Sequence, residues 1–575
     1  MKTMRVWAPT PKRVSCRFDS RTEPMARAED GWWSVRLPDG VEDYGFILDG
    51  EGPFPDPRSP WQPDGIHGLS RMVDFAGFPW TDDGFRAPPL SAAVIYEAHV
   101  GTFSPEGTFE GMIPKLDHLV ELGVTHLELM PVNEYSGEWG WGYDGVDWYA
   151  PHHAYGGPAG LQKLVAACHA RGLAVLLDVV YNHLGPAGNH LGRFGPYFSD
   201  AYHTFWGAAV NLDGPGSDEV RRFICDNALM WLRDYHFDGL RIDAVHAFHD
   251  RSATPLLEQL AREVRTLEAV TGRNMVLIAE SDLNDPRLLW SLDRGGCGMD
   301  GQWSDDFHHA LHTVLSGETS GYYEDFGRLE HIAKALRGAY VYDGQFSKHR
   351  QRRHGRSAEG LTGRRFLGYL QNHDQIGNRA AGERSSHLLN TGRLKIGAAL
   401  VIMSPFVPML FQGEEWGAMS PFLYFTSHSD KSLARAVREG RRREFAAFGW
   451  RKQDIADPQA RSSFLRSKLD WNEPGLEKHS GLLEWHRELI RLRRSHPALA
   501  EDRLEDVRVD YDESARWLTL ERGSLVVAVN LGSRRQPVPL PSKARRRVLL
   551  GSVSGLRPGH SSINLPPDSV AILSG

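Results

Sequence analysis

Cysteine is scarce in this chain: its 575 residues contain four, at positions 16, 168, 225 and 297. They lie far apart, so the sequence has neither the closely spaced pairs of a zinc site nor the cysteine framework of a disulfide-rich domain. We therefore expect free thiols in a reducing compartment.

Long apolar runs are also missing. No stretch reaches the roughly 18 apolar residues that span a bilayer, and residues 1–7 contain no run long enough for a signal peptide. The formal net charge is only −7 over the whole chain, which argues against nucleic acid or an anionic membrane as the main partner. We expect a soluble, cytoplasmic protein without a nucleic-acid or membrane partner.

A glycine-rich phosphate-binding turn after an early strand is absent too, which disfavours a doubly wound sheet. From about residue 89, apolar runs typical of strands alternate with amphipathic helical runs, which predicts parallel strands joined by helices. Strands are expected at residues 94–98, 125–131, 174–180, 239–244, 276–280, 366–371 and 407–411, with a weaker one at 298–303. Helices are expected at 112–122, 161–170, 219–235 and 255–270. This pattern fits a closed (β/α)8 TIM barrel, an α/β fold, better than an open sheet.

The two ends of the chain differ from its middle. Residues 1–88 have short strand-like pieces and no helical period, which predicts an N-terminal β-sandwich domain. After about residue 497 the alternation stops, and short strands predict a C-terminal β-sandwich domain. The expected domains are therefore 1–88, a catalytic barrel at 89–497, and 498–575. The basic stretch 438–443 is predicted to be a solvated or ion-paired face of a helix.

Four of the predicted strands end in acidic or His-Asp residues. The segments are LLDVVYNH at 176–183, GLRIDAVH at 239–246, LIAE at 277–280 and LQNHD at 370–374. Barrel enzymes carry their chemistry at the C-terminal ends of the strands. One such residue is often only a hydrogen-bonding strand end, but four in this order are hard to explain by packing.

The carboxylates at these ends suit the hydrolysis of a glycosidic bond. This reaction needs one acid to protonate the leaving oxygen and one carboxylate to meet the oxocarbenium-like centre. Arg241 lies two residues before Asp243, so both point to one face of a strand, and an Arg keeps a neighbouring carboxyl ionised. Glu280 follows an aliphatic run that suits a general acid, and Asp374, beside His373, can bind sugar hydroxyls in the transition state.

The four segments resemble the signature regions of glycoside hydrolase family 13, the α-amylase clan, and the resemblance covers most of residues 89–497. It implies that Asp243 is the nucleophile, Glu280 the acid/base and Asp374 the transition-state stabiliser. It further implies that the sugar before the cleaved bond is framed by Tyr143, Asp178, His183, Arg241 and His373. Some members bind calcium where Asn182 stands, but residues 185–216 lack the acidic cluster of a site with six to eight oxygens. We expect no metal and no cofactor.

Two further segments, LIAESDLNDPR at 277–287 and GEEWGAMSPFLYFT at 413–426, resemble the maltooligosyltrehalose trehalohydrolases within this family. That resemblance implies hydrolysis of the α-1,4 bond next to the terminal trehalose of maltooligosyltrehalose, releasing trehalose and a malto-oligosaccharide. It also implies functional pairing with a maltooligosyltrehalose synthase. Residues expected beyond the cleaved bond or in the same cleft are His246, Asp305, Asp306, Phe307, His308, His309, Gln375, Asn378 and Arg379.

Two other functions stay open. A glycogen (1,4-α-glucan) branching enzyme would use the same three carboxylates with a sugar hydroxyl as acceptor, although the two further segments disfavour it. A non-catalytic glycan-binding or transporter-associated protein would typically lack the catalytic acids and carry a membrane anchor. The sequence retains Asp243, Glu280 and Asp374 and has no long apolar anchor.

Overall fold

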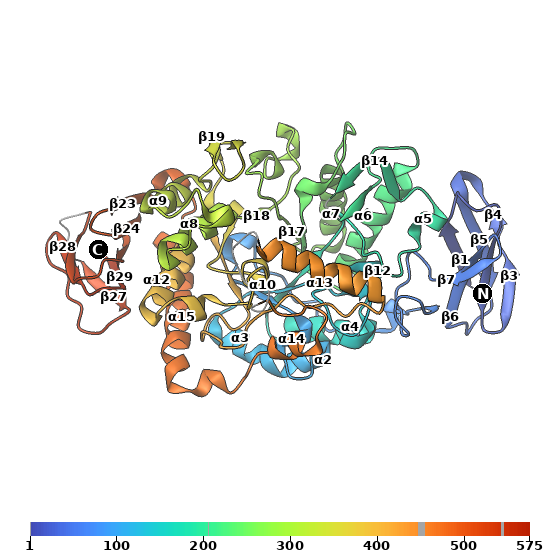
Figure 1. The fold of residues 1–575 in the computed structure, drawn as a ribbon, viewed down its shortest axis with the longest axis horizontal. Coiled ribbons are helices and arrows are strands. Elements are labelled where there is room, and N and C mark those ends of the chain that lie inside the picture. Colours follow the sequence, from blue (N-terminus) through green and yellow to red (C-terminus); the bar gives the residue numbers. More distant parts are fainter. Residues whose placement is uncertain (1, 205, 447–454, 542–545) are drawn as a thin grey trace.

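The computed structural model describes residues 2–204, 206–446, 455–541 and 546–575. Its centre is a closed barrel of parallel strands, with a sheet domain at each end of the molecule (Figure 1). The pairing of β22 with β9 closes the cylinder. The barrel strands are β9 (Ile95–Ala98), β10 (His126–Leu129), β13 (Ala174–Val179), β16 (Gly239–Ile242), β17 (Val276–Ala279), β18 (Gly301–Trp303), β21 (Phe366–Gly368) and β22 (Val407–Phe411). The predicted TIM barrel is confirmed, including its weak strand at 298–303.

These strands are short aliphatic runs buried on both faces, as parallel strands under helices are. Side chains alternate between the two faces, and a set that includes Leu176, Ile278 and Trp303 packs together inside the barrel. The same period of two brings polar residues to the interior rim, because Asp178 lies two residues after Leu176 and Glu280 two after Ile278.

Helices cover the outside of the barrel. The four predicted helices correspond to α3 (Leu116–Leu122), α4 (Gly157–His169), α6 (Ser217–Asp234) and α7 (Leu256–Thr271). The first begins late because Pro114 lies in a 3-10 turn, and it ends at Gly123, whose φ of 95° suits glycine. Later helices are α8 (Asp305–Ser316), α9 (Leu329–Gly338), α10 (His373–Gly377), α12 (Thr391–Ile402), α13 (Lys431–Ala446), α14 (Arg461–Arg466) and α15 (Glu477–Ser495).

Hairpins extend from the loops of the barrel. They are β11 (Asn133–Tyr135) with β12 (Gly145–Pro151), β14 (Phe198–Thr204) with β15 (Gly207–Val210), and β19 (Asp343–Ser347) with β20 (Arg352–Gly355). The first two lie in the connections that follow β10 and β13, so they rise from the end of the barrel where the polar strand tips lie.

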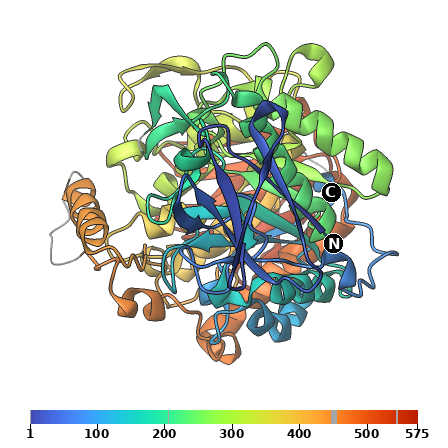
Figure 2. The ribbon, with the colours of Figure 1, turned by 90° about the vertical axis from the view of Figure 1, so that its right-hand side faces the viewer.

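The N-terminal domain consists of two sheets, seen in front of the barrel in Figure 2. One contains β1 (Lys2–Trp7), β5 (Trp32–Leu37) and β4 (Ala26–Arg27); the other contains β3 (Arg21–Pro24), β2 (Val14–Phe18), β6 (Asp43–Leu48), β7 (Glu51–Phe54) and β8 (Ser70–Arg71). The Trp32 indole donates to Glu219 (3.1 Å), and Arg58 pairs with Asp226 (2.7 Å), so polar contacts tie this domain to α6.

The C-terminal domain pairs β23 (Arg508–Asp512), β24 (Trp517–Arg522), β25 (Leu525–Asn530), β29 (Ser569–Ser574) and β27 (Arg547–Gly551) in one sheet, and β26 (Gln536–Pro539) with β28 (Ser562–Leu565) in another. We propose 1–88, 89–497 and 498–575 as the domain limits. No helix in the described part of the chain is long and apolar enough to cross a membrane. The four cysteines are unpaired.

Candidate active site

Arg241 lies at the centre of the polar cluster at the C-terminal end of the barrel. Its side chain is fully buried on β16, and Nη1 donates to both oxygens of Asp178 (2.9 and 2.8 Å) and to Oδ1 of Asp243 (2.7 Å). Its guanidinium also lies 4.1 Å from the ring of Trp303. One cation therefore fixes two of the predicted carboxylates at the interior rim.

Asp243 is held on both sides. While Arg241 binds Oδ1, the amide Nδ2 of Asn182 donates to Oδ2 (2.7 Å) and to the Asp243 main-chain carbonyl (3.0 Å). Asn182 stands where some members of the family bind calcium. In this structure its side chain binds the predicted nucleophile directly. Two donors, one of them charged, give this carboxylate a fixed orientation.

Glu280 faces the same guanidinium from the next strand. Its Oε2 lies 3.8 Å from Arg241 Nη2 and accepts a hydrogen bond from the main-chain N–H of Ala244 (2.6 Å). Ala244 has a φ of 41°, an uncommon conformation for a residue other than glycine. Burial raises the pKa of Glu280 well above its ordinary value, against the opposing charge of Arg241. A carboxyl with a raised pKa, held close to a second carboxylate, is the pairing that acid-base glycosidases use.

His373 connects the rim to the barrel interior. Its Nδ1 donates to Oε1 of Glu97 (2.5 Å), its main-chain N–H donates to Oε2 (3.1 Å), and Nε2 donates to the hydroxyl of Tyr143 (2.8 Å). That hydroxyl donates onward to Asp178 (2.5 Å), and the Tyr143 and His373 rings stack at 5.2 Å. Burial opposes the imidazolium, but the Glu97 carboxylate outweighs it and raises the pKa of His373 to about 9.

The ion pair between His373 and Glu97 is expected to make stability depend on pH. The pKa of His373, about 9 in the folded protein, is raised above the roughly 6.5 of an unfolded chain. Its stabilising contribution is therefore complete below about pH 6.5 and is lost as the pH rises through about 9. We expect the thermal midpoint to fall over this window, and to fall less in a His373→Gln variant, which cannot carry the charge. Equal pH slopes for the two proteins would contradict a charged His373.

Asp374 is the most exposed of the three predicted catalytic carboxylates, with 45% of its side chain accessible. It is the second residue of α10, where Asn372 caps the helix by accepting from the Asp374 N–H (2.9 Å). Its Oδ1 lies 3.6 Å from His373 Nε2 and accepts from the amide of Asn378 (3.4 Å). The carboxylate is therefore accessible to a ligand at this end of the barrel.

A Trp that the sequence analysis missed lies beside His183. Trp206, in the turn of the β14–β15 hairpin, stacks on the His183 ring with centroids 4.6 Å apart and planes within 10°. It is 48% exposed, which is unusual for so large an apolar ring. Exposed rings of this kind serve as stacking surfaces for sugars. The sequence feature that could have pointed to Trp206 is its position between two short strand-like pieces.

Among the residues predicted beyond the cleaved bond, three reach the accessible surface. His246 is exposed in the short turn after β16. Asp305, the first residue of α8, accepts from the Tyr369 hydroxyl (2.5 Å), and burial raises its pKa to about 7. His309 lies one helical turn later on the same face, against the rings of Tyr322 and Tyr323. The charge of Asp305 acts on Glu280.

The other three residues of this cluster face inward. Phe307 is 0% exposed and packs on Phe406, so the prediction that it contacts substrate is wrong. His308 is also fully buried, with Nδ1 donating to the Leu370 carbonyl (2.8 Å), and belongs to the core. Asp306 accepts from the main-chain N–H groups of residues 341 and 342, and so holds a loop in place. The helical period of α8 turns these positions away from the face that carries Asp305 and His309.

The three predicted residues that follow the segment LQNHD (370–374) make hydrogen bonds to other residues of the protein. Gln375 completes the cap of α10 by accepting from the Asn372 N–H (3.2 Å). Arg379 makes two hydrogen bonds to Glu318, each 2.8 Å long. Asn378 donates to Asp374, a proposed catalytic side chain.

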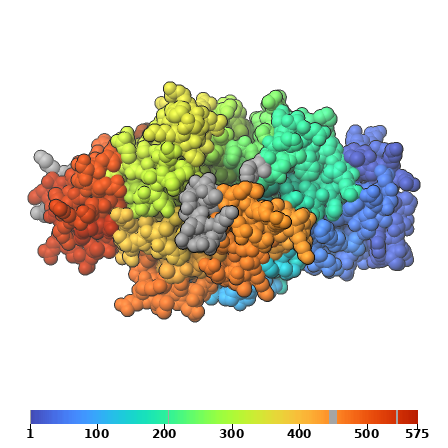
Figure 3. Space-filling model, viewed as in Figure 1, coloured from blue at the N-terminus to red at the C-terminus, as the bar shows by residue number. Residues whose placement is uncertain are grey.

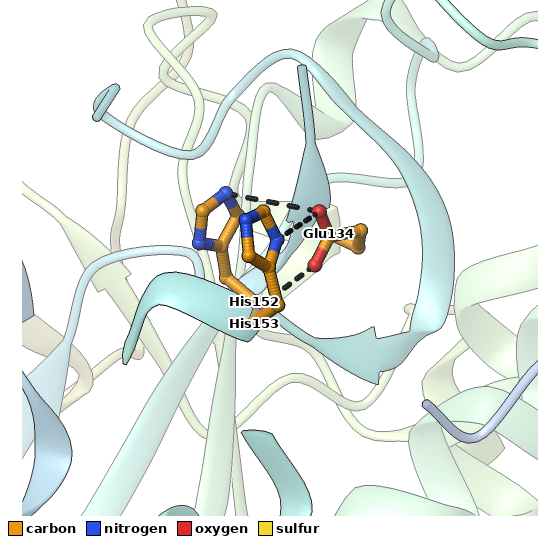
Figure 4. Close-up of side chains that lie close together, drawn as sticks. All are labelled: Glu134, His152 and His153. Atoms are coloured by element: carbon orange, nitrogen blue, oxygen red, sulfur yellow. Dashed lines mark hydrogen bonds and ion pairs between the residues drawn. The ribbon is translucent and has the colours of Figure 1, made fainter. Parts of the chain in front are cut away.

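One group in the described residues has the spacing of a metal site: Glu134, His152 and His153 have ligand atoms within 4.8 Å of one another (Figure 4). The Ala154 N–H donates to Nδ1 of His152 (3.2 Å), so the ring hydrogen is on Nε2, which donates to the Gly137 carbonyl (3.1 Å). His153 donates to both Glu134 oxygens, from Nδ1 and from its main-chain N–H. No lone pair of His152 faces the group, so these side chains do not fit a cation. They tie the ends of β11 and β12 together.

The family described as alpha amylase, catalytic domain, matches residues 69–193, and a domain of unknown function (DUF3459) matches residues 502–572. A malto-oligosyltrehalose trehalohydrolase from Arthrobacter ramosus is 50% identical over 99% of this chain and 98% of its own length. One from Mycobacterium tuberculosis is 49% identical over 100% and 99%.

A solved structure and a second enzyme class complete the comparison. The crystal structure of a putative alpha amylase from Salmonella typhimurium superposes with a TM-score of 0.91 at 37% identity, covering 100% of this chain and 97% of that one. A 1,4-alpha-glucan branching enzyme from Photobacterium profundum is 31% identical, but over only 51% of this chain and 46% of its own. The likeness to the branching enzyme is therefore partial.

Proposed function

This chain belongs to the malto-oligosyltrehalose trehalohydrolases, glycoside hydrolases of the α-amylase family, and we propose that it cleaves the α-1,4 bond next to the terminal trehalose of maltooligosyltrehalose. The products are trehalose and a malto-oligosaccharide. The observation that carries this proposal is the placement of Asp243 and Glu280 on one buried guanidinium, that of Arg241.

The first step assigns one carboxyl to each end of the breaking bond. Glu280 donates its proton to the glycosidic oxygen, which leaves as a hydroxyl of trehalose, while an Asp243 oxygen bonds to the anomeric carbon. Because burial raises the pKa of Glu280, its carboxyl keeps its proton to a higher pH than an ordinary glutamic acid does. Arg241 and Asn182 hold Asp243 so that little reorganisation precedes the attack.

The second step reverses the roles. The Glu280 carboxylate takes a proton from a water molecule, the water oxygen bonds to the anomeric carbon, and the bond to Asp243 breaks. Two displacements at one carbon leave the malto-oligosaccharide in the α-anomer. Glu280 then carries the proton with which it began.

The remaining site residues divide between the two sides of the bond. We place Tyr143, Asp178, His183 and His373 around the sugar that becomes attached to Asp243, with Asp374 on its hydroxyls and Trp206 at its outer edge. The polar residues His246, which is exposed, and Asp305 and His309, which are partly exposed, are our choice for the trehalose side. Buried Asp306 and His308 support those residues from below.

Product analysis on two matched substrates tests the function. We expect maltotriosyltrehalose to yield trehalose and maltotriose, the latter at first in the α-anomer, and maltopentaose to be cleaved far more slowly. Maltopentaose alone should give no trehalose, because a synthase must first create the trehalose end. On the basis of the family we also propose functional pairing with a maltooligosyltrehalose synthase and a cytoplasmic location. Absence of trehalose would refute the function, and initial β-anomer would refute the double displacement. A branching enzyme would instead give amylose new α-1,6 links and reduce its iodine colour.

A further inference from the structure

Arg441, on the basic helix α13, reaches the helix that carries Asp374. In Figure 2 α13 stands out at the edge of the molecule, and in Figure 3 its orange surface covers the middle of the visible face. Nη1 of Arg441 donates to Oδ1 of Asn378 (3.0 Å), and Nη2 donates to the carbonyl of Gly377 (2.9 Å). Both acceptors lie at the C-terminal end of α10, a place where a cation is favoured by the unpaired helix carbonyls.

This contact fixes the orientation of the Asn378 amide. A guanidinium can only donate, so the amide oxygen must face Arg441. The amide nitrogen then faces Asp374 and donates to its Oδ1 (3.4 Å). A rotated amide would direct its oxygen at the carboxylate and repel it. Because Asp374 is nearly half exposed, this amide is a direct constraint on where the carboxylate points.

Arg441 is itself positioned by aromatic rings of the same site. Its guanidinium lies 4.5 Å from the ring of Tyr424, which contacts Trp141 edge-on at 5.1 Å. Trp141 packs against His373 with ring centroids 5.4 Å apart. Stacking on a ring leaves the edge donors of a guanidinium free to point at acceptors. Arg441 therefore joins α13, the aromatic cluster and α10.

We propose that Arg441 is a positioning residue for Asp374, acting through the Asn378 amide. The proposal rests on the function proposed above, in which Asp374 binds the sugar more tightly in the transition state than in the ground state. Loss of Arg441 therefore reduces transition-state stabilisation more than substrate binding, which lowers kcat and leaves KM nearly unchanged.

The test is a double-mutant cycle on purified full-length protein with maltotriosyltrehalose. We expect Arg441→Met to lower kcat about 10-fold with KM changed less than about twofold, and Asn378→Ala to have a similar effect. The double variant is expected to lose no more than the larger single loss, because both changes remove one coupled contact. Arg441→Lys, which keeps the charge but not two coplanar donors, is expected to lose about threefold.

Arg435→Met on the same helix is the matched control, since Arg435 is 77% exposed and pairs with Glu439 at the surface. It is expected to keep wild-type kcat, KM and thermal midpoint. Independent, multiplying losses for Arg441→Met and Asn378→Ala would overturn the inference, as would a raised KM at unchanged kcat, which indicates direct substrate contact. If Arg441→Met does not fold, Arg441→Lys with Asn378→Ala completes the same cycle. Wild-type protein that releases no trehalose refutes the function, whereas active wild-type with an equally active Arg441→Met refutes only the positioning role.

Discussion

Replacing Asp243 with Asn is expected to lower the rate of trehalose release by on the order of 10⁴-fold or more. An amide cannot form the covalent bond to the anomeric carbon, and it removes the negative charge that faces the oxocarbenium-like transition state. The measurement is steady-state kcat/KM on maltotriosyltrehalose, with trehalose quantified directly.

The structure defines the control for this variant. In the Asp243→Asn variant the amide oxygen can still accept from Arg241. The amide nitrogen then faces Nδ2 of Asn182, which in the wild type donates to Asp243, so two donors oppose each other. We therefore expect a small fall in thermal midpoint, to be measured alongside activity, and a substrate-binding constant close to that of the wild type. Activity within tenfold of the wild type would mean that another group is the nucleophile. A non-catalytic glycan-binding protein would be indifferent to the change.

The barrel and its three acidic tips were predictable because both depend on local sequence. Aliphatic runs form strands buried on two faces, and the period of two then determines that Asp178 and Glu280 share the interior with Leu176 and Ile278. The weakest prediction, β18, is a strand of three residues that begins with Gly301, so it has little pattern to read.

The contacts that tune the site could not be predicted in this way. Asn182 binds Asp243 across 61 residues, and Glu97 binds His373 across 276, so no local pattern marks either pair. The inward position of Phe307 could have been predicted from the sequence. In a helix that begins at Asp305, residues 305 and 309 share one face and residue 307 does not. In the basic stretch 438–443, Arg438 pairs with Asp457 and residues 442 and 443 are exposed, as expected of a solvated or ion-paired face. No local pattern shows that Arg441 points toward α10.

Replacing Glu280 with Gln is expected to lower kcat by about 10²–10⁴-fold while leaving substrate binding largely intact, because protonation of the leaving oxygen matters mainly in the transition state. The Ala244 N–H can donate to the amide oxygen as it does to the carboxyl, so the variant keeps the local geometry. The fluoride leaving group of a maltosyl fluoride needs no proton. The Glu280→Gln change should therefore slow the first step with maltosyl fluoride far less than it slows the first step with maltotriosyltrehalose.

The raised pKa of Glu280 also predicts how kcat/KM changes with pH. Burial raises the pKa of Glu280, and the acid must be protonated to act, so kcat/KM of the wild type is expected to fall as the pH rises through that raised value. Glutamine does not titrate, so in Glu280→Gln the alkaline limb assigned to this residue should disappear from the residual activity. An unchanged alkaline limb, or equal losses on the fluoride and the natural substrate, would show that a different residue delivers the proton. In that event Asp305, whose pKa is raised to about 7 and whose charge acts on Glu280, is the group to test next.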